Sequence, residues 1–123
     1  MRSHGFTLIE LLVALAIIAL LLSIVVPRYF GSLTRADEAA LKEDLYLMRD
    51  AIDKHFADTG RYPTSLEELA TKKYLRAVPV DPVTQSTASW IVVPPADPQL
   101  GAVYDVRSGA KGIARDGRPY DQW

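Results

Sequence analysis

One carboxylate lies inside an otherwise apolar run near the start of the chain. Glu10 belongs to the 21-residue stretch from Phe6 to Val26, in which Thr7 and Ser23 are the other polar residues. A helix of this length spans roughly 30 Å, the hydrocarbon thickness of a bilayer. A carboxylate in such a helix costs several kcal/mol unless it is neutralised, paired or close to the headgroups. Glu10 therefore needs a partner.

The residues leave two interpretations of Glu10 open. In the first, the side chain lies near a helix start, where it reaches the interface or meets the positive end of the helix dipole. In the second, a cation reaches it from another chain. Glu10 is structural in the first interpretation and functional in the second.

The apolar run is longer than the 7 to 15 residues usual for a cleaved secretory signal, and it ends in "VVPRYF" rather than at an A-x-A site. It is therefore predicted to stay in the membrane. Arg2 and the amino terminus precede it, which favours a cytoplasmic N-terminus, although Arg28 on the far side weakens that preference.

The stretch "GFTLIELLVALAIIALLLSIVVPRYF" resembles the N-terminal signature of type IV pilins and of type II secretion pseudopilins. The resemblance implies that a prepilin peptidase removes residues 1–5 as a leader by cutting after Gly5, and that Phe6 is then N-methylated. It also implies that Glu10 pairs with the new amine of Phe6 on a neighbouring subunit, with Thr7 in the same assembly site. Such a buried pair mainly sets the register between subunits.

Composition limits the other functions. The chain has 123 residues, a formal net charge of -1 and no cysteine, which excludes a disulfide framework, a thiolate zinc site and a cysteine nucleophile. It lacks a phosphate-binding glycine loop, an HExxH motif and a recognisable Ser-His-Asp arrangement. The basic turn from Arg107 to Arg118 has no interleaved aromatic platform. We therefore expect no catalytic residue, no enzyme and no nucleic-acid partner.

The elements that position these residues begin with two helical patterns. Residues 6–27 form the predicted membrane and filament-core helix, and Pro27 predicts a kink because it removes a helical hydrogen bond. Residues 32–58 form an amphipathic helix, in which His55 is expected to be partly exposed. Its predicted inward stripe is Leu41, Leu45, Met48, Ile52 and Phe56.

The rest of the chain predicts a short helix at residues 65–73, capped by Thr64 or Ser65 with Glu67 or Glu68 three residues later. Strands are predicted at 89–94, 102–107 and 112–115, with an Asp-Gly turn at 116–117. The fold class is therefore α+β and type IV pilin-like. In it a long N-terminal helix packs on a three-stranded antiparallel sheet, with a short second helix between them.

Tyr62-Pro63 and "PVDP" at 79–82 extend the resemblance toward the major, G-type pseudopilins. Relatives of that kind bind calcium through acidic side chains and carbonyls of a C-terminal loop. Here Lys111 stands where that loop tends to carry an aspartate. The nearby carboxylates are Asp105, Asp116 and Asp121, among Arg107, Lys111, Arg115 and Arg118. Because calcium takes six to eight oxygen ligands, we expect no cofactor, with calcium kept as the alternative. The basic turn then does structurally what calcium does, and contacts the acidic helix face of a neighbouring subunit.

These patterns together predict a structural subunit of a type II secretion pseudopilus that drives export of folded proteins. It crosses the inner membrane once, with the N-terminus cytoplasmic and the domain of residues 28–123 periplasmic. The expected partners are copies of the same chain, other pseudopilins, prepilin peptidase, an inner-membrane assembly platform and, before assembly, lipid. The alternative is a type IV or competence pilus, whose subunits are usually longer and often carry a disulfide.

Overall fold

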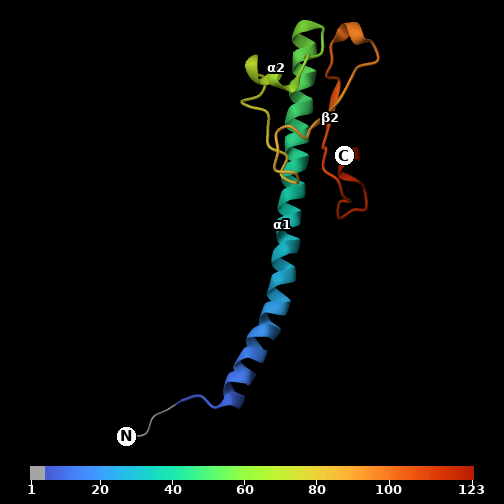
Figure 1. Ribbon diagram of the computed structural model, residues 1–123. Coiled ribbons are helices and arrows are strands. Elements are labelled where there is room, and N and C mark those ends of the chain that lie inside the picture. The colour runs from blue at the N-terminus through green and yellow to red at the C-terminus, as the bar shows by residue number, and fades with distance from the viewer. Residues whose placement is uncertain (1–4) are drawn as a thin grey trace. The chain divides into compact units, whose positions relative to one another are not determined.

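The computed structural model describes residues 5–123, apart from the side chains of residues 27–33. The chain divides after Arg35 into two compact units, and helix α1 (Leu8–Thr59) contributes to both. The second unit adds helix α2 (Leu66–Thr71), strands β1 (Ile91–Val93) and β2 (Asp105–Arg107), and two 3-10 turns, η1 (Pro98–Leu100) and η2 (Tyr120–Gln122) (Figure 1). Among the described residues, helices and a small sheet therefore make an α+β chain.

The first unit consists of the N-terminal part of α1. Its side chains from Leu8 to Val26 are all exposed, including those of the large aliphatic residues. Apolar side chains on every face of a helix indicate that the helix is covered by something outside this chain.

Pro27 lies within the residues assigned to α1, but its side chain falls outside the described part. A proline inside a helix bends it by removing one hydrogen bond and by steric clash. The kink at Pro27 stays a prediction.

In the second unit, the predicted inward stripe of α1 is confirmed at four of its five positions. Leu41, Leu45, Met48 and Ile52 are at most 2 % exposed. The fifth position is wrong, because Phe56 is 36 % exposed. Residue 55, three positions after Ile52, turns inward instead, as a step of three on a helix allows.

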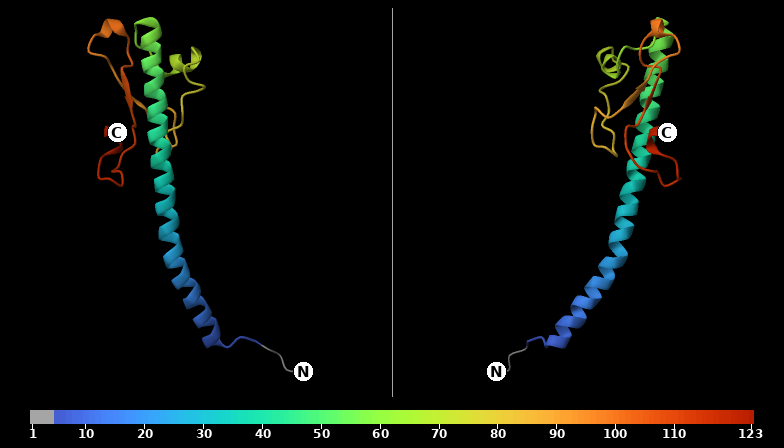
Figure 2. Two further views of the ribbon diagram at one scale, coloured as in Figure 1. Left: turned by 180° about the vertical axis from the view of Figure 1, so that it is seen from behind. Right: turned by 45° about the vertical axis from the view of Figure 1, so that its right-hand side comes forward.

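The hydrophobic core joins this stripe to residues from the rest of the second unit. Within that unit, α2 and the C-terminal part of the chain lie on different sides of the helix (Figure 2). Both sides contribute buried side chains: Leu66 and Leu69 from α2, and Trp90, Val103, Val106, Ala110, Ala114 and Tyr120 from the strands and the C-terminal segment. Burial of these groups supplies most of the stability of a small domain.

Helix α2 forms as its capping residues predict. The Oγ of Ser65 accepts a hydrogen bond of 3.2 Å from the backbone N–H of Glu68, which selects Ser65 over Thr64 as the cap. The helix is shorter than the predicted 65–73, because it ends at Thr71 and Lys73 adopts φ +64°. A left-handed residue cannot continue a right-handed helix.

Strands β1 and β2 pair antiparallel, with Val92 opposite Val106, but both are shorter than predicted. The ladder stops after Val93 because Pro94 and Pro95 have no backbone N–H to donate. On the other strand, the N–H groups of residues 102 and 103 donate to the carbonyl of Pro63, at 3.1 and 2.9 Å. These two N–H groups therefore cannot donate hydrogen bonds to β1.

The third strand predicted at residues 112–115 is wrong for the described residues, which form a two-stranded sheet. Ile113 makes only an isolated bridge to Pro119, which lacks a backbone N–H and so cannot extend a ladder. The predicted Asp-Gly turn is confirmed: Gly117 has φ +88°, and its N–H donates to the carbonyl of Ala114 at 2.9 Å.

Candidate processing and assembly site

Glu10 and Thr7 bond each other at the start of α1. The backbone N–H of Glu10 donates to Oγ1 of Thr7 at 3.2 Å, and the N–H of Thr7 donates to Oε2 of Glu10 at 3.3 Å. Because α1 begins at Leu8, this reciprocal pair is a capping box. It satisfies two N–H groups that a helix start leaves unpaired.

This geometry agrees with the first interpretation of Glu10, in which its side chain lies at a helix start. The carboxylate lies in the first turn of the helix, where the dipole is positive. The sequence signal that could have predicted the bond pair is "TLIE" in front of an apolar run, a Thr-x-x-Glu pattern. The pair engages one carboxylate oxygen, and the expected bond to a neighbouring subunit stays a prediction.

Gly5 and Phe6 precede the helix and are exposed, Phe6 to 86 %. A Cβ added at Gly5 would meet no atom within 4 Å. The fold of this chain therefore does not require glycine at position 5. The other residues of the expected leader, 1–4, lie outside the described residues.

The segment that follows is long and apolar enough to cross a membrane. Leu8–Val26 is 19 residues with a mean hydropathy of 3.0, and none of it is buried within the chain. The expected helix over residues 6–27 begins two residues later than predicted, because Thr7 serves as its cap. Glu10 thus lies within the first turn of this segment, close to its end.

Two of the three carboxylates considered as calcium ligands have other partners. Oδ1 of Asp105 accepts from Arg49 Nε at 2.9 Å and from the N–H of Val106 at 2.8 Å. Asp116 accepts from the N–H and Nε of Arg118, each at 2.9 Å, and these bonds lower the pKa of the Asp116 carboxyl. One oxygen of Asp105 and both oxygens of Asp116 are therefore bonded to arginines.

Asp121, the third carboxylate, is exposed in η2. Calcium needs at least six oxygen ligands in one shell. Among the described residues, no group of three or more acidic, histidine or cysteine side chains is placed to hold a metal. The donor set of this segment does not fit calcium.

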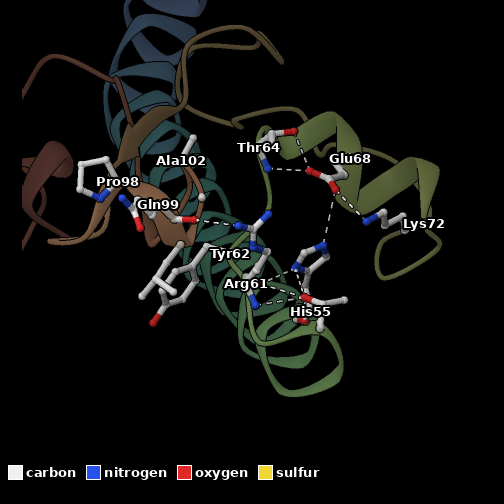
Figure 3. A pocket seen from close by; sticks show the side chains of 12 residues that line it. His55, Arg61, Tyr62, Thr64, Glu68, Lys72, Pro98, Gln99 and Ala102 are labelled. Atoms are coloured by element: carbon white, nitrogen blue, oxygen red, sulfur yellow. Dashed lines mark hydrogen bonds and ion pairs between the residues drawn. The ribbon is translucent and has the colours of Figure 1, made fainter.

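His55 is buried, only 2 % exposed, which corrects the expectation of a partly exposed side chain. It lines a hollow of about 500 Å³ between α1, α2 and the loop around Gly101 (Figure 3). Its Nδ1–H donates to the carbonyl of Arg61 at 2.7 Å, since a carbonyl only accepts. Its Nε2 lies 3.6 Å from Oε1 of Glu68. The ring thus lies against α2, but its Nε2 has no hydrogen-bond partner among the described residues.

Glu68 has several partners beside His55. Its Oε2 accepts from the N–H and the hydroxyl of Thr64, at 2.6 and 2.7 Å, and its Oε1 pairs with Lys72 at 2.8 Å (Figure 3). The bond to Lys72, followed by those to Thr64, lowers the pKa of Glu68 from 4.5 to about 2. The carboxylate stays charged and ties the turn before α2 to its end.

The N-terminal residues match a known family model, and much of the chain matches known proteins. Residues 1–26 match the model described as the prokaryotic N-terminal methylation motif. The type II secretion system core protein G of Dickeya chrysanthemi is 32 % identical over 107 residues, which cover 87 % of this chain and 69 % of the relative. No solved structure matched.

Two further relatives carry the same name. The type II secretion system core protein G of Aeromonas hydrophila and that of Escherichia coli are each 31 % identical over 97 residues, or 79 % of this chain. These residues cover 68 % and 67 % of the two relatives, respectively. The similarity thus extends from the N-terminal motif into the second unit. The chain belongs to the family of type II secretion system core protein G, the type IV pilin-like major pseudopilins.

Proposed function

We propose that this chain is a structural subunit of a type II secretion pseudopilus. The observation that carries the proposal is the exposed apolar helix Leu8–Val26, together with the carboxylate in its first turn. A helix that is apolar on all faces needs a bilayer or other helices around it. The same segment serves as the membrane anchor before assembly and as the filament core afterwards.

Processing creates the mature subunit. Prepilin peptidase cleaves between Gly5 and Phe6, and the new amine of Phe6 is methylated. The methylation motif over residues 1–26 supports this step. So does the exposure of both residues, because a peptidase needs access to the bond that it cuts.

Assembly then pairs Glu10 of one subunit with the Phe6 amine of another. Cleavage converts a neutral peptide nitrogen at Phe6 into a cation, and an unpaired carboxylate among apolar helices is strongly penalised. The bond from the N–H of Thr7 orients the Glu10 side chain at the helix start. A subunit placed out of register would leave both charges unpaired, so the pair selects the correct stagger.

The second unit is exported to the periplasm and the N-terminus stays in the cytoplasm. The subunits polymerise with each other and with other pseudopilins on an inner-membrane assembly platform. The growing filament drives folded proteins across the outer membrane. The role is mechanical rather than enzymatic, and nucleic acid is not a partner.

The second candidate is a subunit of a type IV or competence pilus, which would use the same anchor. Similarity to core protein G across 87 % of the chain favours the secretion system. The chain also lacks cysteine and therefore the disulfide that pilus subunits often carry.

Mass spectrometry of the mature chain tests the proposal. In cells that supply prepilin peptidase, we expect a chain that starts at Phe6 and carries one added methyl group. The matched variant is Gly5→Val, because a side chain at position 5 meets nothing in the fold. It should insert into the membrane but keep residues 1–5. Cleavage at another bond in the wild-type chain would refute the processing step.

A further inference from the structure

One arginine holds together three oxygen atoms from distant parts of the second unit. The Nε of Arg49 donates to Oδ1 of Asp105 at 2.9 Å, and its Nη2 donates to the backbone oxygens of Val106 at 3.0 Å and Trp123 at 2.6 Å. Arg49 lies on α1, whereas these partners lie 56, 57 and 74 positions along the chain. The side chain is 35 % exposed, so these bonds are partly shielded from water.

The acceptors around Arg49 are of the two kinds of oxygen that also bind calcium in proteins. Calcium in proteins is surrounded by carboxylate and backbone carbonyl oxygens, and here a guanidinium takes oxygens of both kinds. Its planar fork of donors is always charged and can reach several acceptors at once. We propose that the guanidinium of Arg49 takes the place of a bound metal ion in this domain. It holds the C-terminal segment, residues 105–123, against α1.

Two more residues on the same side of α1 hold the same segment. Lys42 lies 4.9 Å from the ring centre of Trp123, and Arg118 lies 5.7 Å from it, so two cations contact one aromatic ring. Glu38 accepts from the N–H of Arg115 at 2.9 Å and from the hydroxyl of Tyr120 at 3.0 Å. The segment is thus attached along the helix at Glu38, Lys42 and Arg49.

The charges where the C-terminal segment contacts α1 disfavour the binding of a metal ion. A hollow of about 220 Å³ beside this contact is lined by Lys42, Arg49, Arg118, Leu45 and Trp123. Three of these side chains are cationic and none is a carboxylate. A divalent cation entering here would meet like charges at short range, which costs free energy. Within its own chain, the basic turn contacts Glu38 through the backbone N–H of Arg115, and Trp123 and Asp116 through the side chain of Arg118. Its expected contact with a neighbouring subunit stays a prediction.

Thermal unfolding of the full chain in detergent tests this proposal. The two tryptophans, Trp90 and Trp123, both lie in the second unit, so tryptophan fluorescence reports its unfolding. The melting temperature should be the same in chelator, in millimolar calcium and in millimolar magnesium. A rise of many degrees with calcium but not with magnesium would overturn the proposal.

The variant Arg49→Met should lower the melting temperature by roughly 10 °C, because it removes the charged donor from three acceptors, of which Oδ1 of Asp105 keeps the N–H of Val106. Lys54→Met is the control: it removes a cation of α1 that makes only an exposed pair with Asp50, and should shift the melting temperature by about 2 °C or less. Arg49→Lys keeps the charge but lacks the fork, so we expect an intermediate loss, measurable even if Arg49→Met does not fold. Equal melting temperatures for the Arg49 variants and the control would contradict the proposal. Filament assembly is not part of the readout, so this test is independent of the proposed function.

Discussion

At the scale of single residues, Glu68 shows how one carboxylate ties together the two ends of a short helix. It accepts from Thr64 and Lys72 around α2, and it faces the buried His55 of α1. These bonds favour the charged carboxylate, which is why the pKa of Glu68 falls to about 2. The sequence predicted a glutamate in capping position, but the inward turn of His55 depends on tertiary packing and has no sequence signal of its own.

The lowered pKa of Glu68 makes stability depend on pH. Since the folded pKa lies below the ordinary value of 4.5, the contribution is fully present above that pH and is lost as the pH falls toward 2. We expect the free energy of unfolding to fall by about 1 to 2 kcal/mol more for the wild type than for Glu68→Gln between about pH 5 and pH 2, a value reduced for solvent screening. Denaturant titrations across this range measure it. Identical pH profiles for the two proteins would contradict the assigned role of Glu68.

At the scale of elements, local patterns predicted the helices better than the strands. The apolar stripe of α1 and the Ser65 cap of α2 depend on neighbouring residues and could be predicted. Strand β2 was predicted to start too early because the N–H groups of residues 102 and 103 bond to Pro63, about 40 positions away. No local pattern contains that competition, and the third strand failed because Pro119 sits opposite Ile113.

Gly101 fixes the point where the chain turns into β2, and its replacement tests that account. It has φ +134°, and an added Cβ would clash with the carbonyl oxygen of Tyr62, a backbone atom that cannot move cheaply. Gly101→Ala should lower the free energy of unfolding by about 2 to 4 kcal/mol. The control is Gly60→Ala, with φ +72° but open space around it, which should cost about 1 kcal/mol. Denaturant unfolding measures the free energy of unfolding of both variants. Equal losses would mean that the clash with Tyr62 does not destabilise Gly101→Ala.

At the scale of the whole molecule, the N-terminal residues were predicted but their mutual bonds were not. The apolar run and the cost of Glu10 were identified from residue type and position, whereas Gly5 and Phe6 were identified from the resemblance to prepilins, and the methylation motif matches residues 1–26. The capping box between Thr7 and Glu10 was not predicted, although a Thr-x-x-Glu pattern in front of an apolar run is its sequence signal. The carboxylate of Glu10 thus has one bond to Thr7 within its chain and one proposed bond between subunits.

Replacement of Glu10 by glutamine separates these two roles. Glutamine can still accept the bond from the N–H of Thr7, since capping boxes use either Glu or Gln, but it cannot form an ion pair. Thr7→Val is the matched control, because it removes the Oγ1 acceptor while Glu10 keeps its charge. Both variants should insert and be cleaved after Gly5 like the wild type.

The most direct measurement is a count of filaments by electron microscopy in cells that overproduce each protein with its secretion machinery. We predict that Glu10→Gln and Glu10→Ala both abolish filaments, whereas Thr7→Val reduces them only modestly. Normal filaments from a correctly cleaved Glu10→Gln chain would contradict the account, because Glu10 would then serve only to cap its own helix.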